Sequence, residues 1–308
     1  MQMNEQRPIA VGMGELLWDL LPGGKQLGGA PFNFARHCGQ FGMESFPVSR
    51  VGADRLGNEV ISSLRSWNIT SNYVSLDSLH STGAVEVALD DHGKPTYTIR
   101  EGVAWDFLSH SANLKELALQ VDLICFGTLA QRSEVSRSAI YSFLDLMRPD
   151  ALKLFDVNLR QNYFSIENLN ESLRRANVLK LSDEELPALK NGFSLSGPIS
   201  KQLSDLRTRF DLKLVAYTRG AEGSVLVDDS GLHEHPGYPI EVVDTIGAGD
   251  SFSATLCIGL MQGLPLCRLN ENANKVAAYV CSQPGATPGL PHDLVAKIST
   301  SSKNEPQT

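Results

Sequence analysis

The stretch DTIGAGDSF, residues 244–252, places small residues and a carboxylate where a helix is expected to begin. If the helix starts near Gly249, its first amide groups are unpaired and its dipole is positive at this end. Gly247, Ala248 and Gly249 carry little or no side chain, so an anion can approach their N–H groups closely. Asp250 then lies beside the anion, placed to take a proton from an attacking hydroxyl, which favours phosphoryl transfer. A plain helix N-cap formed by Asp250 is the alternative.

A second glycine-rich helix start occurs in QLGGAPFNFARHCGQFG. Gly28 and Gly29 precede Pro31, which suits the first turn of a helix. Asn33 follows one turn later, and its amide offers both a donor and an acceptor to a pair of sugar hydroxyls. A glycine-proline helix entry with a polar surface asparagine explains the same residues.

Three common motifs are incomplete or absent. PGGKQLGG contains a glycine-lysine pair, but Asp19 occupies the first glycine position of a P-loop and Gln26 follows the lysine, which excludes that motif. GMGELL has Leu17 at the third glycine position of GxGxxG, so a dinucleotide site is a poor second hypothesis. A GxSxG nucleophile motif is absent from the sequence.

Composition narrows the class of protein. The chain has 308 residues, 42 % hydrophobic and 20 % charged, as in ordinary soluble proteins. A net charge of −8 disfavours binding to nucleic acid or to anionic membranes. The five cysteines lack paired spacing and the seven histidines lack metal-binding clusters, which argues against a disulfide framework and a zinc site. With no signal peptide or long apolar run, we expect a cytoplasmic protein.

Short apolar runs alternate with amphipathic stretches between residues 120 and 220. This rhythm predicts an α/β fold with a doubly wound, mostly parallel sheet flanked by helices. The expected strands lie within 121–129, 152–159, 177–182 and 213–220, and the expected helices within 133–147, 165–176 and 197–210.

The N-terminal third predicts a second, small sheet. After a first strand at 9–13, the run ELLWDLLP alternates two carboxylates, Glu15 and Asp19, against three apolar side chains. Segments 83–90 and 95–100 predict a hairpin around Asp91-His92-Gly93. Such a sheet is either a lid over a ligand or a structural flap. The apolar side chains are Leu16, Trp18 and Leu20.

The two glycine-rich stretches together resemble the signatures of the ribokinase-like (PfkB) carbohydrate kinases, and the similarity runs from Val11 to about Pro291. The resemblance implies one kinase domain over 1–308, with a small β-sheet lid at about 14–28 and 83–103. We expect a disordered tail at 299–308. The resemblance also implies phosphorylation of a sugar hydroxyl that depends on ATP and Mg²⁺.

The family's site residues map onto matching positions. Asp250 matches the catalytic base, and Gly247, Ala248 and Gly249 match the anion hole. Asp244 corresponds to a ligand of an activating monovalent cation, usually K⁺. The matching sugar contacts are Asp19, Gly28, Gly29 and Asn33. YTRGAEGS is similar to the nucleotide loop, and the matching nucleotide contacts are Thr218, Gly220, Gly223 and Asn274.

One stretch departs from the family. KLSDEEL lies where many members have Asn-x-x-Glu, which is tied to Mg²⁺ and phosphate binding. Ser182 replaces the asparagine and Glu185 keeps the glutamate. Serine can still donate to a phosphate or to metal-bound water, so we interpret the change as a variant. The same two residues also form a good capping box.

FDVNLR, at the end of an expected core strand, carries Asp156, Asn158 and Arg160 toward the crevice where open α/β sheets bind ligands. The pattern resembles the fructokinase and 2-keto-3-deoxygluconate kinase branches. GELLWDLLP, LGGAPFNFA and EGVAWD most resemble bacterial fructokinases. A keto-deoxy acid stays an alternative substrate, because Arg160 with Tyr97 and Arg100 of the lid would match a carboxylate. Another hexose, a pentose or a nucleoside also remains open.

Two further expectations concern other classes and assembly. A sugar-binding protein of this fold that has lost catalysis is a competing hypothesis, although Asp250 and its glycines are intact. Lids in this family often pair, so we predict a homodimer in which a second subunit covers Leu16, Trp18 and Leu20.

Overall fold

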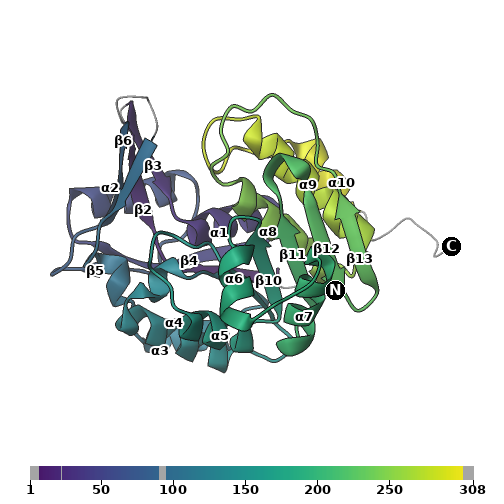
Figure 1. The fold of residues 1–308 in the computed structure, drawn as a ribbon. Coiled ribbons are helices and arrows are strands. Elements are labelled where there is room, and N and C mark those ends of the chain that lie inside the picture. Colours follow the sequence, from purple (N-terminus) through teal and green to yellow (C-terminus); the bar gives the residue numbers. More distant parts are fainter. Residues whose placement is uncertain (1–6, 22, 90–94, 301–308) are drawn as a thin grey trace, which may run out of the picture.

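A nine-stranded, mostly parallel sheet runs through the centre of the molecule, with helices on both faces (Figure 1). The computed structural model describes residues 7–21, 23–89 and 95–300. Two strands at one edge run antiparallel to their neighbours, and the other seven are parallel. In spatial order the strands are β13 (Gly231–His235), β12 (Ser224–Asp228), β11 (Leu214–Thr218), β10 (Val178–Ser182), β9 (Leu152–Asp156), β8 (Leu123–Phe126), β1 (Ile9–Met13), β4 (Glu44–Gly52) and β5 (Val74–Asp77).

Side chains of the central strands alternate between two cores because successive residues of a strand point to opposite faces. On β1, Val11 and Met13 join one cluster and Ala10 joins the other. The first cluster packs against α3 (Ala112–Ala118), α4 (Glu134–Leu146), α5 (Ile166–Arg175), α6 (Leu186–Phe193) and α7 (Ile199–Arg209). The second packs against α1 (Ala30–Gln40), α8 (Ala248–Met261) and α9 (Leu266–Cys281).

The predicted doubly wound sheet is therefore confirmed. The four strands and three helices expected between residues 120 and 220 correspond to β8–β11 and to α4, α5 and α7. The tail prediction is wrong at its first two residues, because α10 (His292–Thr300) continues through them and packs on α9 through Leu294 and Ile298. The rest of that tail lies outside the described residues.

Three 3₁₀ turns are η1 (Ala104–Phe107), η2 (Leu129–Arg132) and η3 (Gly220–Glu222).

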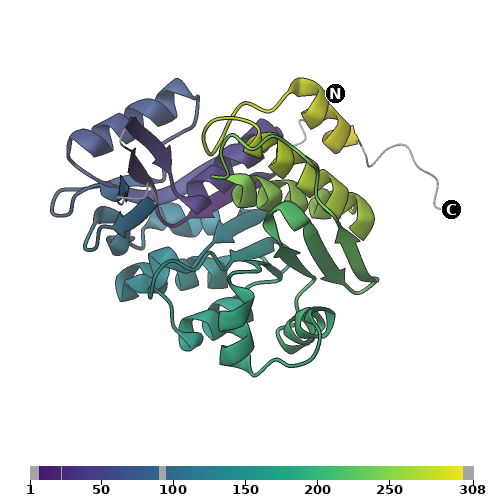
Figure 2. The same ribbon diagram turned by 45° about the horizontal axis from the view of Figure 1, so that its top comes forward.

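A separate four-stranded sheet forms where the second, small sheet is predicted, and it is called the lid below. Its order is β3 (Gly24–Gly28), β2 (Leu17–Leu21), β6 (Gly83–Leu89) and β7 (Pro95–Ile99). β2 pairs antiparallel with β3 and parallel with β6, so two separated segments build one sheet. The turned view places the lid and α2 (Arg55–Ser66) at one end of the molecule, with α9 and α10 toward the other (Figure 2). The predicted turn at Asp91-His92-Gly93 lies outside the described residues.

The apolar face of β2 is covered by this chain itself. Leu16 is fully buried and Trp18 is 6 % exposed, in a cluster with Val60 and Leu64 of α2. Leu20 is half-buried against the same cluster. The prediction that a second subunit covers this face is wrong, because α2 already occupies it. A homodimer stays a prediction that needs another surface.

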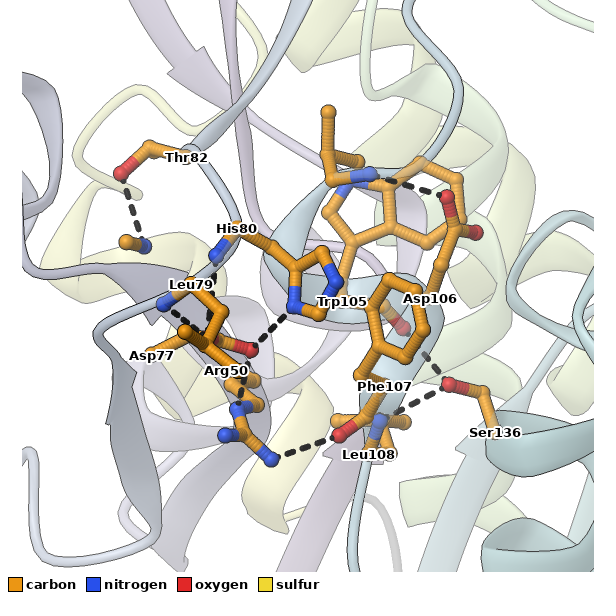
Figure 3. A network of polar contacts seen from close by, with 12 residues as sticks. Arg50, Asp77, Leu79, His80, Thr82, Trp105, Asp106, Phe107, Leu108 and Ser136 are labelled. Atoms are coloured by element: carbon orange, nitrogen blue, oxygen red, sulfur yellow. Dashed lines mark hydrogen bonds and ion pairs between the residues drawn. The ribbon is translucent and has the colours of Figure 1, made fainter.

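A polar network fixes the base of the lid to the large sheet (Figure 3). Arg50 of β4 pairs with Asp77 through Nε at 2.8 Å and donates from Nη1 to the Phe107 carbonyl. His80 donates its backbone N–H to Asp77, and its ring stacks on Phe107 with centroids 3.6 Å apart. These contacts connect the segment that enters β6 to β4 and to η1. They therefore fix the base of the lid relative to the large sheet.

Candidate functional site

The glycine-rich start of α8 is formed as predicted, one residue earlier than expected. Gly247 is the N-cap with φ +78°, and a side chain there would overlap the carbonyl of Ala286. Gly247 therefore has no room for a side chain, because the loop before α10 packs against it. Ala248 begins the helix, and its N–H donates to the Thr245 carbonyl at 3.4 Å. The first N–H groups of a helix have no partner within the helix.

Asn33 and Asp250 meet although 217 residues separate them. Asn33 Nδ2 donates to Asp250 Oδ2 at 2.8 Å, because α1 and α8 begin side by side. Asn33 Oδ1 is buried and has no hydrogen-bond partner among the described residues. This free acceptor suits a substrate hydroxyl. The predicted sugar contact and the predicted base thus lie in one site.

The electrostatics of Asp250 suit a general base. Desolvation, followed by the neighbouring Asp156, raises the pKa of Asp250 to about 6. The hydrogen bond from Asn33 and the charges of Lys180 and Arg160 partly offset that rise. A carboxyl with this pKa is mostly ionised at neutral pH and is a better proton acceptor than an ordinary aspartate.

A buried lysine lies behind the anion-binding loop. Lys180 of β10 is 8 % exposed and its Nζ is 3.1 Å from Asp156 Oδ1. Ser253 Oγ of α8 donates to the other oxygen of Asp156 at 3.2 Å. A Cβ atom added at Gly249 would lie 3.1 Å from Lys180 Nζ, so the ammonium borders the loop backbone. The sequence analysis did not identify Lys180 as a site residue. The feature that could have indicated it is a single lysine within the apolar strand VLKLS.

Two carboxylates of the lid segment lie in electrostatic range of Arg160. Burial raises the pKa of Glu15 to about 7 and that of Asp19 to about 6, and Arg160 opposes both shifts. A Cβ atom on Gly28 would lie 2.7 Å from Asp19 Oδ2, so the glycine leaves room for that carboxylate. Gly29 has φ +116°, and a side chain there would overlap the carbonyl of Glu15. Glu15 was missed as a site residue, although the alternation in ELLWDLL placed it on the face of Asp19.

The remaining predicted sugar contacts differ in placement. Asn158 follows β9 with φ +42°, and its carbonyl accepts from Thr128 Oγ1. Arg160 is exposed two residues further on. Arg100 is paired with Glu86 across the exposed lid surface, so its guanidinium is already engaged. Tyr97 belongs to β7, and its side chain lies outside the described part of the chain.

Glu185 joins the carboxyl ends of β9 and β10. One carboxylate oxygen accepts the N–H of Leu159 at 2.9 Å and the other accepts the N–H of Ser182 at 2.7 Å. The second contact is not part of a capping box, because Glu185 is itself the N-cap of α6 and Ser182 ends β10. The carboxylate is buried beside Lys180 and Asp156, whose pKa values it raises. Because each oxygen keeps a further lone pair, the group fits a metal-bound water.

The predicted nucleotide contacts lie at the carboxyl end of β11 and beyond it. Thr218 ends β11, Gly220 begins η3 with φ +53°, and Gly223 closes that turn with φ +77°. Asn274 of α9 is buried, and its Nδ2 donates to Ser224 Oγ and to Asn270. Its amide nitrogen therefore connects α9 to the start of β12. These hydrogen bonds give no support to the predicted contact with a purine.

Asp244 connects two loops at the start of α8. Its Oδ1 accepts the N–H of Ile246 at 3.0 Å and its Oδ2 accepts the N–H of Gly285 at 3.1 Å. The next residue after Gly285 is Ala286, which packs on Gly247. Asp244 thus lies beside residues 247–249, with hydrogen-bond partners different from those of Asp250.

The described residues contain neither a cluster of metal ligands nor a membrane-spanning helix. Over 7–21, 23–89 and 95–300, no group of three or more His, Cys, Asp or Glu is placed to hold a metal ion. Within the same ranges, none of the helices has the length and apolarity needed to cross a membrane.

The α/β fold brings a carboxylate with a raised pKa to a glycine-rich helix start, which fits the class of protein expected from the sequence, a kinase of small molecules. The pfkB family carbohydrate kinase model matches residues 22–293. The chain belongs to that family.

Individual relatives agree with this assignment. The chain is 30 % identical to a fructokinase of Klebsiella pneumoniae, covering 91 % of this chain and 95 % of the relative. It is 29 % identical to a putative sugar kinase of Pyrococcus horikoshii, covering 92 % and 93 %. The crystal structure of that kinase in complex with ATP superposes with a TM-score of 0.78 over 94 % of this chain and 99 % of the other, at 28 % identity. A Xylella fastidiosa fructokinase shares the fold with a TM-score of 0.81 at 20 % identity, covering 96 % and 99 %.

The raised pKa of Glu15 predicts how stability depends on pH. Its carboxyl binds a proton more tightly in the folded than in the unfolded chain, so the stability it supplies is present below its usual pKa of 4.5 and is lost as pH rises through about 7. We expect Glu15→Gln to lose less free energy of unfolding than the wild type between about pH 5 and about pH 8. Urea denaturation at both pH values measures this. Glu44→Gln, at an exposed position of β4, is the control, and equal pH dependence in Glu15→Gln and the wild type would contradict the assignment.

Proposed function

We propose that this protein transfers the γ-phosphoryl group of ATP to a hydroxyl of D-fructose. The observation that carries the proposal is the placement of Asp250 at the start of α8, with a raised pKa, a contact to Asn33 and a buried lysine nearby. A base, an anion-binding backbone and a fixed positive charge are the components that phosphoryl transfer requires.

In the proposed step, Asp250 takes the proton of the sugar hydroxyl as the oxygen attacks the γ-phosphorus. The new oxygen–phosphorus bond forms while the bond to the β,γ-bridging oxygen breaks, and ADP leaves with that electron pair. The N–H groups of Gly247, Ala248 and Gly249 face the charge on the transferred group. Lys180, behind Gly249, adds positive charge without leaving its pair with Asp156.

The cofactor assignments are also proposals. Mg²⁺ neutralises phosphate charge when bound, and Glu185, with Ser182 beside it, would hold it through water. Thr218, Gly220 and Gly223 would line the nucleotide site, and an ATP complex of the related Pyrococcus kinase supports this use of ATP. Asn274 stays a proposed contact near the purine, although its amide nitrogen donates to Ser224 and Asn270. Asp244 would serve a K⁺ site, since it bridges the loops at the start of α8.

Fructose is favoured over a keto-deoxy acid by the charges around Arg160. Glu15 and Asp19 both lie within its electrostatic range, so the positive charge is partly compensated before a substrate arrives. Arg100, the second cation that an acid would use, is paired with Glu86. A neutral sugar bound by Asp19, Asn33, the glycines 28 and 29, and Asn158 fits this balance. The fructokinase relative named above supports the same choice.

A substrate panel tests this choice. With MgATP and equal concentrations of D-fructose, 2-keto-3-deoxygluconate, ribose and adenosine, we expect the highest kcat/KM for fructose by coupled ADP release. Arg160→Ala should raise KM for fructose about tenfold to a hundredfold, since a hydrogen bond from a charged group to a hydroxyl contributes about 1.5–3 kcal/mol. A preference for the keto-deoxy acid that Arg160→Ala abolishes would overturn the proposal in favour of that substrate. Saturable sugar binding without any ADP release would instead favour the catalytically inactive binding protein.

A further inference from the structure

A cavity of about 280 Å³ lies between the lid, α1, α2 and the loop before α10. Trp18 lines it, and so does Gln26, the partner of Asp19 across β2 and β3. The described residues of the lining include none of the proposed sugar contacts, so the cavity is distinct from the proposed sugar site. Its walls come from β2 and β3 of the lid, from α1, from α2 and its C-cap, and from the loop before α10. The residues of that loop at the wall are Pro284, Gly285, Thr287 and Pro288.

Arg36 of α1 supplies an uncompensated positive charge to this cavity. Its guanidinium lies over the ring of Trp67 at 3.8 Å, and its Nη1 is buried without an acceptor among the described residues. Burial lowers the pKa of Arg36, and no neighbouring carboxylate opposes this shift. A buried donor of a charged group that lacks a partner is costly, which makes it a strong site for an incoming acceptor.

The other wall residues complement an anion. Among the described residues, the lining contains a second cation, Lys25, and no acidic side chain. Lys25 forms an ion pair with Glu59 outside the cavity lining, so Arg36 is the unneutralised charge. Three side chains can donate further hydrogen bonds, and they come from β3, α2 and the loop before α10: Gln26, Ser63 and Thr287.

From this arrangement we infer that the cavity binds the oxyanion group, phosphate or carboxylate, of a small metabolite, with Arg36 as its principal ligand. The guanidinium edge is suited to two parallel hydrogen bonds to an oxyanion. Because the walls belong to both the lid and the loop that packs on Gly247, a bound anion would bridge these two elements.

The test measures binding without ATP or turnover, so its outcome is independent of the kinase proposal. Inorganic phosphate and malonate are titrated separately against the full chain at constant ionic strength, and Trp67 fluorescence is followed, with Trp67→Phe to identify the local signal. We expect saturable changes for at least one probe. Arg36→Gln should weaken that binding about tenfold or more, because a hydrogen bond to a charged group is lost.

Two variants complete the design. Ser63→Asp adds a carboxylate to the cavity wall on a helix surface and should weaken binding about tenfold by repulsion and by supplying Arg36 with an internal partner. Arg65→Gln removes an exposed charge of the same helix and should leave binding unchanged. The inference is overturned if neither probe gives a saturable signal, or if Arg36→Gln and Ser63→Asp both bind like the wild type. A phosphate-only or a malonate-only response identifies which oxyanion the site accepts.

Discussion

Asp250→Asn is expected to lower kcat for ADP release in the presence of D-fructose by about a thousandfold, within the range that general-base catalysis supplies. The asparagine keeps an oxygen that can accept from Asn33 Nδ2, so the contact between α1 and α8 can persist. It cannot take a proton from the sugar hydroxyl. Steady-state kinetics with a coupled assay measures the loss, and the thermal unfolding curve of the variant should stay close to that of the wild type.

The pH profile of the wild type tests the same residue in a second way. Because the pKa of Asp250 is raised to about 6, kcat/KM is expected to fall as the pH drops through 6 and the carboxyl takes up a proton. Asp250→Asn should lose this limb of the profile. A variant that retains turnover within tenfold of the wild type would show that Asp250 is not the base.

Lys180→Met carries the second large expected effect. Removing the ammonium behind Gly249 should lower kcat about 10²–10³-fold, the cost typical of losing one stabilising group from an anion-binding site. The same change leaves Asp156 buried without its cation, which typically costs about 3–5 kcal/mol of stability. Chemical denaturation and steady-state kinetics measure the two effects separately.

A double variant separates catalysis from folding. Asp156→Asn with Lys180→Met removes both charges, so most of the lost stability should return. Activity should remain low, because the positive charge beside the anion-binding loop is still missing. Near-complete recovery of kcat together with stability would assign Lys180 a purely structural role.

The sequence predicted local elements better than the contacts between them. The glycines of 247–249 located the start of α8 to within one residue, because their lack of side chains is a local property. The meeting of Asn33 with Asp250 depends on how α1 and α8 pack, which their separation along the chain does not reveal. The family resemblance placed both residues at one site before any contact was known.

The sequence does not reveal features that depend on which elements pack together or which side chains pair. The alternation in ELLWDLLP identified the apolar face of β2 but not the helix that covers it, α2. Arg100 stays a predicted substrate contact, but its pairing with Glu86 of the neighbouring strand does not follow from the sequence. Lys180 went unnoticed because a lysine in an apolar run is recognisable as buried only once its neighbour Asp156 is placed.

The most direct test of the central claim follows the labelled phosphoryl group. The protein is mixed with γ-³²P-labelled ATP, Mg²⁺ and D-fructose under single-turnover conditions, and the products are separated. The account predicts that the label moves to a sugar phosphate, and that with Asp250→Asn it stays in ATP over the same time. Label that remains in ATP with the wild type, or appears only as inorganic phosphate, would contradict it.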